Sequence, residues 1–396
     1  MDPIRNPFAP GAGTPPPELA GRAEFLARAG VVLQRVRAGK PEKSFIATGL
    51  RGVGKTVLLV RLQEMAEELG FRTSLIEARE QTPLPQLLAP QIRRLLLELD
   101  RLGSLSEAVK RGLRVFRSFI SSLKLKHGDF ELVLDVDPEN GTADSGDLET
   151  DLPDLLVALG QAAASRQAAI ALLIDELQYV SEIEMSALIM ALHRAAQQRL
   201  PIVMLAAGLP QVIGVTGRSK SYAERLFDFP EIGPLSAEES RRALAEPADA
   251  AGVRFTEEAL EALFHVTKGY PFFLQEWGYT VWNLAEASPI TAADVHAATA
   301  EAIAKLDRSF FRVRFDRLTP REKSYLRAMA ELGPGPHRSG DIADLLGIRV
   351  QAAGPLRSGL IRKGMIYGPA FGGTAFTVPL FDQFMKRTMP DWRDLR

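Results

Sequence analysis

The most constraining feature of the sequence is a glycine-rich segment that lies between an apolar run and a helical pattern. It reads Gly49-Leu-Arg-Gly-Val-Gly-Lys55-Thr56, follows the apolar residues 44–48 and opens a helix expected over residues 55–69. Glycines at these positions let the backbone curl, so that successive N–H groups point inward at phosphate oxygens. The N-terminus of the helix adds partial positive charge. The spacing therefore predicts a loop that binds the phosphates of a nucleotide.

Each residue of this loop is a candidate contact for the nucleotide. Lys55 is expected to reach the β- and γ-phosphates and to assist catalysis there, and the Thr56 hydroxyl is expected to ligate Mg²⁺. ATP and Mg²⁺ are therefore the cofactors that the motif implies. The predicted nucleotide contacts of the loop are Gly49, Leu50, Arg51, Gly52, Val53, Gly54, Lys55, Thr56 and Val57.

A second chemical element is an apolar run that ends in two acids, Leu172-Leu-Ile-Asp175-Glu176. A strand of this kind places its carboxylates at the C-terminal edge of the sheet, next to the phosphate-binding loop. We expect Asp175 to hold Mg²⁺ through its water shell. We expect Glu176 to accept a proton from the attacking water. Alone, such a run is more often a solvated strand end, so the assignment depends on the neighbouring loop.

Strands alternate with helices up to about residue 234. Residues 44–48, 73–77, 169–174 and 202–207 are predicted strands, and the run 169–174 is apolar on both faces, as in the centre of a parallel sheet. Helices between these runs imply right-handed βαβ crossovers and an α/β fold with a doubly wound parallel sheet. Residues 131–136 are predicted to add a strand, and the acidic segment 137–151 is predicted to be a mobile loop.

The strand pattern stops near residue 235. Three predicted helices near the C-terminus, at 319–332, 339–346 and 353–363, are followed by two short strands around a glycine-rich hairpin, which is the order of a winged helix-turn-helix. The predicted parts of the chain are a proline-rich arm, a sheet domain, an all-α domain and a winged helix domain, at residues 1–18, 19–234, 235–304 and 305–396.

The N-terminal arm carries six prolines within residues 1–17. Proline forbids helix and removes backbone donors, so the arm is predicted to be extended. Two interpretations remain open from the sequence. The arm is either a disordered tail or a segment that packs on the body of the protein through the apolar anchors Ile4 and Phe8.

The composition excludes several classes of site. The chain has 396 residues and no cysteine, which rules out disulfides, zinc–thiolate sites, iron–sulfur clusters and thiol nucleophiles. No signal peptide and no segment long enough to span a bilayer is apparent, so a cytoplasmic protein without a membrane partner is expected. The net charge of −1 hides an asymmetry, because residues 305–396 hold 17 Lys and Arg against 9 Asp and Glu. The basic end and the acidic body are expected to face different partners.

Three segments together resemble the AAA+ and STAND branch of P-loop ATPases: Gly21-Arg22-Ala-Glu24, the phosphate-binding loop and the Ile-Asp-Glu strand end. An all-α domain followed by a winged helix is similar to the archaeal origin-recognition ATPases. The resemblance implies ATP hydrolysis and places Arg22 near the adenine; a surface arginine at a helix start is the alternative. Gly269-Tyr-Pro271 resembles a G-x-P motif whose proline touches the nucleotide, and the alternative is an ordinary first-turn proline.

Two departures from that pattern point to slow hydrolysis or a nucleotide-held switch. Members of the family usually have a polar residue at the end of the fourth strand, where this chain reads Leu205-Ala-Ala-Gly208. The all-α domain also lacks an obvious arginine where many AAA+ proteins contact the γ-phosphate, since Gly-Tyr-Pro occupies that position. Both differences remove groups that promote hydrolysis.

The resemblance also implies two partners. Arg225 lies where the family carries an arginine that acts on a neighbouring subunit, so a homo-oligomer is implied; an ordinary surface arginine, or one paired with Glu224 or Asp228, is the alternative.

Residues 339–378 of the winged helix are expected to bind double-stranded DNA, with a recognition helix that carries Arg357, Arg362 and Lys363. The alternative is a signalling or scaffold protein whose winged helix binds protein. A metabolic kinase is less favoured, because no acceptor-substrate motif is present.

Overall fold

The computed structural model describes residues 1–11, 13, 15–16, 18–100, 106–123, 137–221, 223–369 and 373–391. Its centre is a parallel sheet with the strand order β2-β3-β4-β1-β5. The strands are β1 Ser44–Thr48, β2 Phe71–Glu77, β3 Ala169–Asp175, β4 Ile202–Gly208 and β5 Phe227–Asp228. Every residue of β3 is buried, as its unbroken apolar run predicts.

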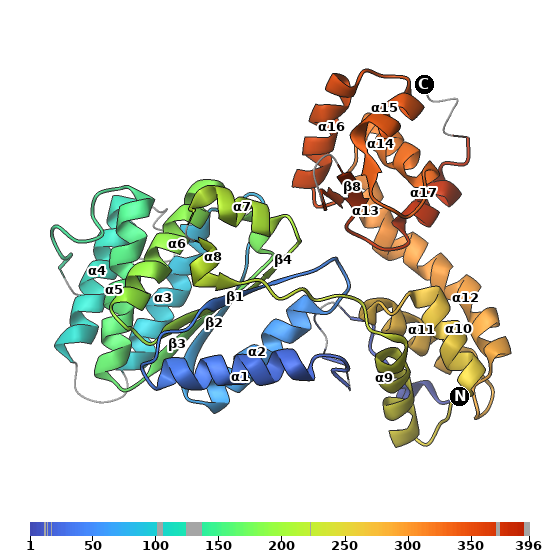
Figure 1. Cartoon of the computed structure of the whole chain (residues 1–396). Coiled ribbons are helices and arrows are strands. Elements are labelled where there is room, and N and C mark those ends of the chain that lie inside the picture. The colour runs from blue at the N-terminus through green and yellow to red at the C-terminus, as the bar shows by residue number, and fades with distance from the viewer. Residues whose placement is uncertain are drawn as a thin grey trace.

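Helices cover both faces of this sheet (Figure 1). On one face, α1 (Ala23–Arg37) and α2 (Lys55–Glu68) pack on side chains such as Phe45 and Leu173. The opposite face, with Ile46 and Leu172, is covered by a larger group of helices. These are α3 Leu84–Asp100, α4 Glu107–Ser122, α5 Leu148–Ser165, α6 Glu182–Gln197, α7 Val212–Ser219 and α8 Ala223–Leu226. Successive strand residues thus enter separate cores, and the predicted doubly wound α/β sheet is confirmed.

Two predictions concern the segment between α4 and α5. The strand expected at 131–136 lies outside the described residues. The mobile loop expected at 137–151 is wrong for residues 148–151, which form the first turn of α5. The helix starts early because the side chain of Asp147 caps it and the buried Asp151 carboxylate accepts hydrogen bonds from Ser145 and Ser122.

The next part of the chain is all-helical and is called the lid here. It consists of α9 Ala237–Ala250, α10 Glu257–Thr267, α11 Pro271–Leu284 and α12 Ala292–Leu306. Side chains of Ser236, Thr256 and Thr291 cap three of these helices by accepting hydrogen bonds from backbone N–H groups in the first turn. A π-helical turn, η4 (Asp307–Phe311), and the short helix α13 (Arg312–Asp316) lead out of the lid.

The C-terminal part has the arrangement of a winged helix-turn-helix, as expected. A three-stranded antiparallel sheet of order β6-β8-β7 packs with the helices. Its strand β6 was not predicted, because two residues are too short to give an alternating pattern. The elements are α14 Pro320–Glu331, β6 His337–Arg338, α15 Ser339–Leu346, α16 Val350–Arg362, β7 Ile366–Tyr367, β8 Gly373–Phe376 and α17 Phe381–Thr388.

The lid and the winged helix share one hydrophobic core. Phe311 of the connecting turn stacks on Phe384 of α17, with ring centroids 5.3 Å apart, and contacts Phe381 at 5.8 Å. The boundary predicted between residues 304 and 305 falls inside α12. These two parts therefore form a single packed body, which lies to one side of the sheet domain in Figure 1.

The N-terminal arm is attached to the lid. The Phe8 ring is buried against Phe255 and Trp282, and the indole N–H of Trp282 donates to the Asp2 carbonyl at 2.9 Å. Ile4, the other predicted anchor, is 94% exposed, so that prediction is wrong. It is exposed because Pro3–Arg5 form a short 3₁₀ turn from which none of the three side chains is buried. Within the described residues, no helix is long and apolar enough to cross a membrane.

These contacts predict a difference between the two apolar residues of the arm. Phe8→Ala should lower the free energy of unfolding of the lid by about 3 kcal/mol, because it leaves a cavity beside Gly278. Ile4→Ala should change it by no more than about 0.5 kcal/mol, since that side chain touches little. Urea unfolding, followed by the fluorescence of Trp277 and Trp282, measures both. Equal effects of the two substitutions would show that the arm does not pack on the lid.

Candidate nucleotide-binding site

The glycine-rich loop, residues 49–57, is here called the P-loop and joins β1 to α2. Gly52 and Gly54 have φ angles of +83° and +90°, a left-handed region that side chains with a Cβ rarely adopt. Gly49 is required for a different reason, because a Cβ there would lie 2.2 Å from the Ile232 carbonyl oxygen. The glycines therefore permit the curl that the motif predicts.

Lys55 begins α2 and is buried. Its Nζ donates to the carbonyl oxygens of Gly49 and Leu50, at 3.0 and 2.9 Å. Burial lowers the pKa of Lys55 to about 8, although the nearby carboxylates of Glu176 and Asp175 oppose that shift. A bound anion would offset this cost of burial, as expected of a lysine that contacts phosphate.

Thr56 and Asp175 meet beside the P-loop. The Thr56 hydroxyl donates to Oδ2 of Asp175 at 2.6 Å, and burial raises the pKa of that carboxyl, against the effect of this hydrogen bond. A hydroxyl and a carboxylate at this separation are oxygen donors of the kind that Mg²⁺ takes, so the residues fit the expected metal. No cluster of three His, Asp or Glu side chains suited to a metal occurs in the described part of the chain.

Glu176 follows Asp175 in a left-handed conformation, with φ +53°. A residue other than glycine in this region is strained, and such residues cluster at functional sites. One carboxylate oxygen pairs with the Arg51 guanidinium at 3.2 Å, and the other accepts a hydrogen bond from the side-chain amide of Gln178. Arg51 also donates to the Tyr179 hydroxyl at 3.1 Å. The candidate base is thus held on both oxygens.

Gln178 supplies a polar group that the sequence analysis had not found. The end of β4 has no polar side chain of its own, but the side-chain Oε1 of Gln178 accepts from the Leu209 N–H at 2.9 Å, directly beside Gly208. Gln178 thereby links Glu176 to the end of β4. The signal was hidden because Gln178 follows β3 in the sequence rather than β4.

Arg22 lies at the start of α1 and reaches the site. One of its guanidinium nitrogens donates to the carbonyl oxygens of Val53 in the P-loop and Gly233 at the end of the sheet domain, at 3.2 and 2.7 Å. Burial lowers its pKa. Arg22 is therefore not merely a surface residue, and it lines the cavity described below.

The lid approaches the P-loop at the start of α11. Pro271 is the first residue of that helix and lines the same cavity as Arg22. The backbone N–H of the next residue, Phe272, donates to the Gly52 carbonyl at 3.1 Å. Gly269 allows the approach, because a Cβ there would lie 2.1 Å from the Leu235 carbonyl oxygen. The Gly-Tyr-Pro segment thus lies against the P-loop.

The winged helix also contacts the P-loop. The Arg51 N–H donates to the Thr377 carbonyl at 3.0 Å. Gly364, at the end of the turn after α16, lies so close that a Cβ there would be 2.9 Å from the Arg51 guanidinium. The sequence gives no signal for this contact, because it joins residues more than 300 positions apart.

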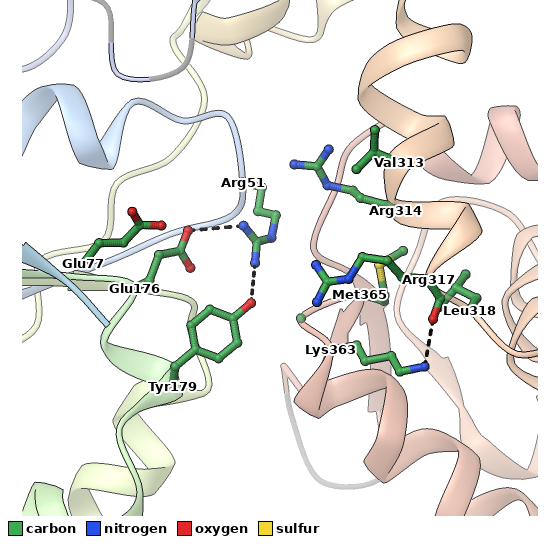
Figure 2. Close-up of a pocket in the computed structure, with 11 residues that line it drawn as sticks. Arg51, Glu77, Glu176, Tyr179, Val313, Arg314, Arg317, Leu318, Lys363 and Met365 are labelled. Atoms are coloured by element: carbon green, nitrogen blue, oxygen red, sulfur yellow. Dashed lines mark hydrogen bonds and ion pairs between the residues drawn. The ribbon is translucent and has the colours of Figure 1, made fainter. Parts of the chain in front are cut away.

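Two adjoining cavities lie where the P-loop, the lid and the winged helix meet. The larger, about 660 Å³, is bounded by the P-loop, the arm, the lid and α13, and its size suits a small-molecule ligand. The smaller, about 260 Å³, lies between the P-loop and the winged helix (Figure 2). Arg51, Glu176, Val313 and Arg314 line both. Arg314 was not among the predicted site residues.

Arg225 lies elsewhere. It is exposed on α8 and lines neither cavity. The ion-pair partner suggested for it, Asp228, pairs instead with Arg28. Arg218 of the preceding helix α7, a second arginine in this region, pairs with Glu182 at 2.8 Å. A role of Arg225 toward a neighbouring subunit stays a prediction.

Comparisons with known proteins agree with this geometry. Residues 18–205 match the family described as AAA ATPase domain, and residues 308–385 match a domain family of unknown function, DUF8462. No curated protein sequence matches the chain significantly.

Similar solved structures extend the comparison to the whole chain. The Walker-type ATPase PABY2304 of Pyrococcus abyssi is 17% identical with a TM-score of 0.59, over 94% of this chain and 97% of that one. The RuvB Holliday junction branch migration motor of Thermotoga maritima is 12% identical (TM-score 0.44; 92% and 94% covered). The Aeropyrum pernix Orc1 protein in complex with DNA is 15% identical (TM-score 0.45; 96% of each chain covered).

The family match includes Arg22, the P-loop and the Asp175–Glu176 strand end, which together form much of the candidate site. The P. abyssi structure shares the fold of nearly the whole chain. Residues 18–205 therefore match the AAA ATPase domain family, and the fold around them is that of a Walker-type ATPase.

Proposed function

We propose that this chain binds ATP with Mg²⁺, hydrolyses it slowly, and uses the nucleotide state to control the position of its winged helix. One observation carries the binding part of this proposal. Lys55, Arg22 and Arg314 border the larger cavity, and within the described residues they donate only to carbonyl oxygens and pair with no carboxylate. Three cations that form no ion pair within the described residues, all around one cavity, match a polyphosphate.

The proposed roles at the phosphates follow from the contacts of each residue. The P-loop amides and Lys55 bind the β- and γ-phosphates, and Arg22 and Pro271 contact the nucleotide from the adenine side and from the lid. Thr56 and Asp175 would hold Mg²⁺, which when bound would neutralise phosphate charge. Glu176 accepts the proton of the attacking water. Arg225 acts on the nucleotide of a neighbouring copy in a homo-oligomer.

Slow turnover is supported by the state of Glu176. Both oxygens of this carboxylate accept hydrogen bonds, from Arg51 and Gln178, so a water that approaches Glu176 competes with these donors. Arg51 is in turn bonded through its backbone to Thr377 of the winged helix. The residue that pairs with Glu176 thus also contacts the winged helix, and we propose that a shift of Arg51 at this contact frees Glu176 and couples hydrolysis to domain position.

The proposed partner of the winged helix is double-stranded DNA, through residues 339–378. A specific observation favours a second candidate, a protein partner. Arg357 donates to Thr374 and Gly373 of the wing strand, and Lys363 pairs with Glu322 at 2.7 Å, so two of the three expected DNA contacts are used within the domain. Arg362 remains exposed on α16.

The P-loop assignment predicts the loss of a ligand effect. ATP at about 100 times its Kd should stabilise the parent chain by about 2.7 kcal/mol, and Lys55→Ala should remove this stabilisation. Thermal unfolding with and without Mg-ATP measures it, with Lys40→Ala, an exposed lysine before β1, as the matched control. Undiminished stabilisation of the Lys55 variant would contradict the proposed phosphate contact.

The role of Glu176 predicts a separation of binding from turnover. Glu176→Gln should keep ATP affinity within about threefold and lower the hydrolysis rate by roughly 10²-fold or more, because the amide cannot accept the proton. Phosphate release and nucleotide titration measure the two quantities, and Glu182→Gln serves as a surface control. A variant that hydrolyses ATP at the parent rate removes Glu176 from catalysis.

The two candidate partners differ in their dependence on salt. Binding of duplex DNA should weaken by about 0.9 in log K per log unit of salt for each phosphate contacted. Arg362→Ala should reduce that slope by about 1, whereas the control Arg308→Ala, an exposed arginine on the η4 turn, should leave it unchanged. Salt-insensitive or undetectable binding by the parent chain favours the protein partner.

A further inference from the structure

Arg314 lies where three parts of the chain meet. It belongs to α13, between the lid and the winged helix, and lines both cavities. Figure 2 shows its guanidinium extending from this helix toward Arg51 and the Glu176 carboxylate on the opposite wall. The P-loop residues Gly54 and Lys55 border the larger cavity as well. Arg314 therefore faces the space above the P-loop from the side opposite β1.

The contacts of Arg314 differ from those of the neighbouring cations. Arg312 pairs with Asp316, Arg317 with Glu80 and Lys363 with Glu322. Arg314 instead donates to the Phe310 carbonyl at 2.5 Å and lies over the Phe310 ring at 4.0 Å, with no carboxylate partner in the described parts of the chain. Burial, with a smaller contribution from Arg51, lowers its pKa to about 10. A partly buried cation whose hydrogen bond and ring contact are both with neutral groups is suited to bind an anion.

The position of Arg314 is fixed by an aromatic stack that ends on the P-loop. Phe310 stacks on Phe272 with centroids 4.7 Å apart, and the Phe272 N–H donates to the Gly52 carbonyl. On the other side, Phe311 stacks on Phe384 of the winged helix. Any shift of the winged helix relative to the P-loop therefore moves Arg314 relative to the phosphates.

We propose that Arg314 contacts the terminal phosphate of ATP within the same chain, and that this contact holds the winged helix against the P-loop. The inference rests on the proposed ATP binding. It supplies the cation that the lid lacks at its Gly-Tyr-Pro segment. Because ADP has no γ-phosphate, ATP favours the docked arrangement and ADP does not, which is the differential affinity that a nucleotide switch requires.

The test compares the affinities of two nucleotides. A non-hydrolysable ATP analogue and ADP, each with Mg²⁺, are titrated by calorimetry into the full chain and into Arg314→Ala, Arg314→Lys and the control Arg312→Ala. Loss of a charge-assisted hydrogen bond should weaken binding of the ATP analogue by about tenfold or more and leave ADP within about twofold. Arg314→Lys should recover part of the loss, and Arg312→Ala should match the parent.

The outcomes separate this inference from the proposed function. If the parent binds neither nucleotide, the proposed function fails. If the parent binds both and Arg314→Ala keeps the parent ratio of the two affinities, the inference is overturned. Should Arg314→Ala not fold, Arg314→Gln and Arg314→Lys decide in its place, because Gln retains a donor for the Phe310 carbonyl without the charge.

Discussion

Backbone groups of one short loop, the P-loop, form hydrogen bonds with α1, the lid and the winged helix. The carbonyl of Val53 accepts from Arg22 at the start of α1, the carbonyl of Gly52 accepts from the lid, and the N–H of Arg51 donates to the winged helix. These groups are available because the curl points them away from helix and strand partners, and only residues without a Cβ tolerate the φ angles at Gly52 and Gly54. The loop proposed to bind phosphates is therefore also a junction between domains.

Local features of the site could be read from the sequence. The curl, the buried lysine and the paired acids at the end of β3 depend on residues that are neighbours in the chain or on a strand pattern with a strong apolar signal. The caps of the lid helices are equally local features, because an N-cap residue and its hydrogen-bonding partner lie within one turn.

Features that depend on docking could not be read in this way. Arg314 reaches the cavity only because the lid and the winged helix pack as one body, and Gln178 reaches the end of β4 only because β3 and β4 are adjacent. For the same reason, fewer cations near α16 are free to contact DNA than the sequence predicts. Arg357 and Lys363 look like exposed cations in the sequence, but their partners, Thr374 and Glu322, come from other elements of the fold.

The shared core of lid and winged helix has a mechanical consequence. Phe311 and Phe384 join the lid and the winged helix within one continuous core, so these two domains cannot rotate independently of each other. The combined body is linked covalently to the sheet domain through the arm and the segment after β5. Gly364, in the turn after α16, and Thr377 both contact Arg51 of the P-loop. A tilt of the combined body about these links would therefore change both contacts together, so the P-loop would register the movement of α16 directly.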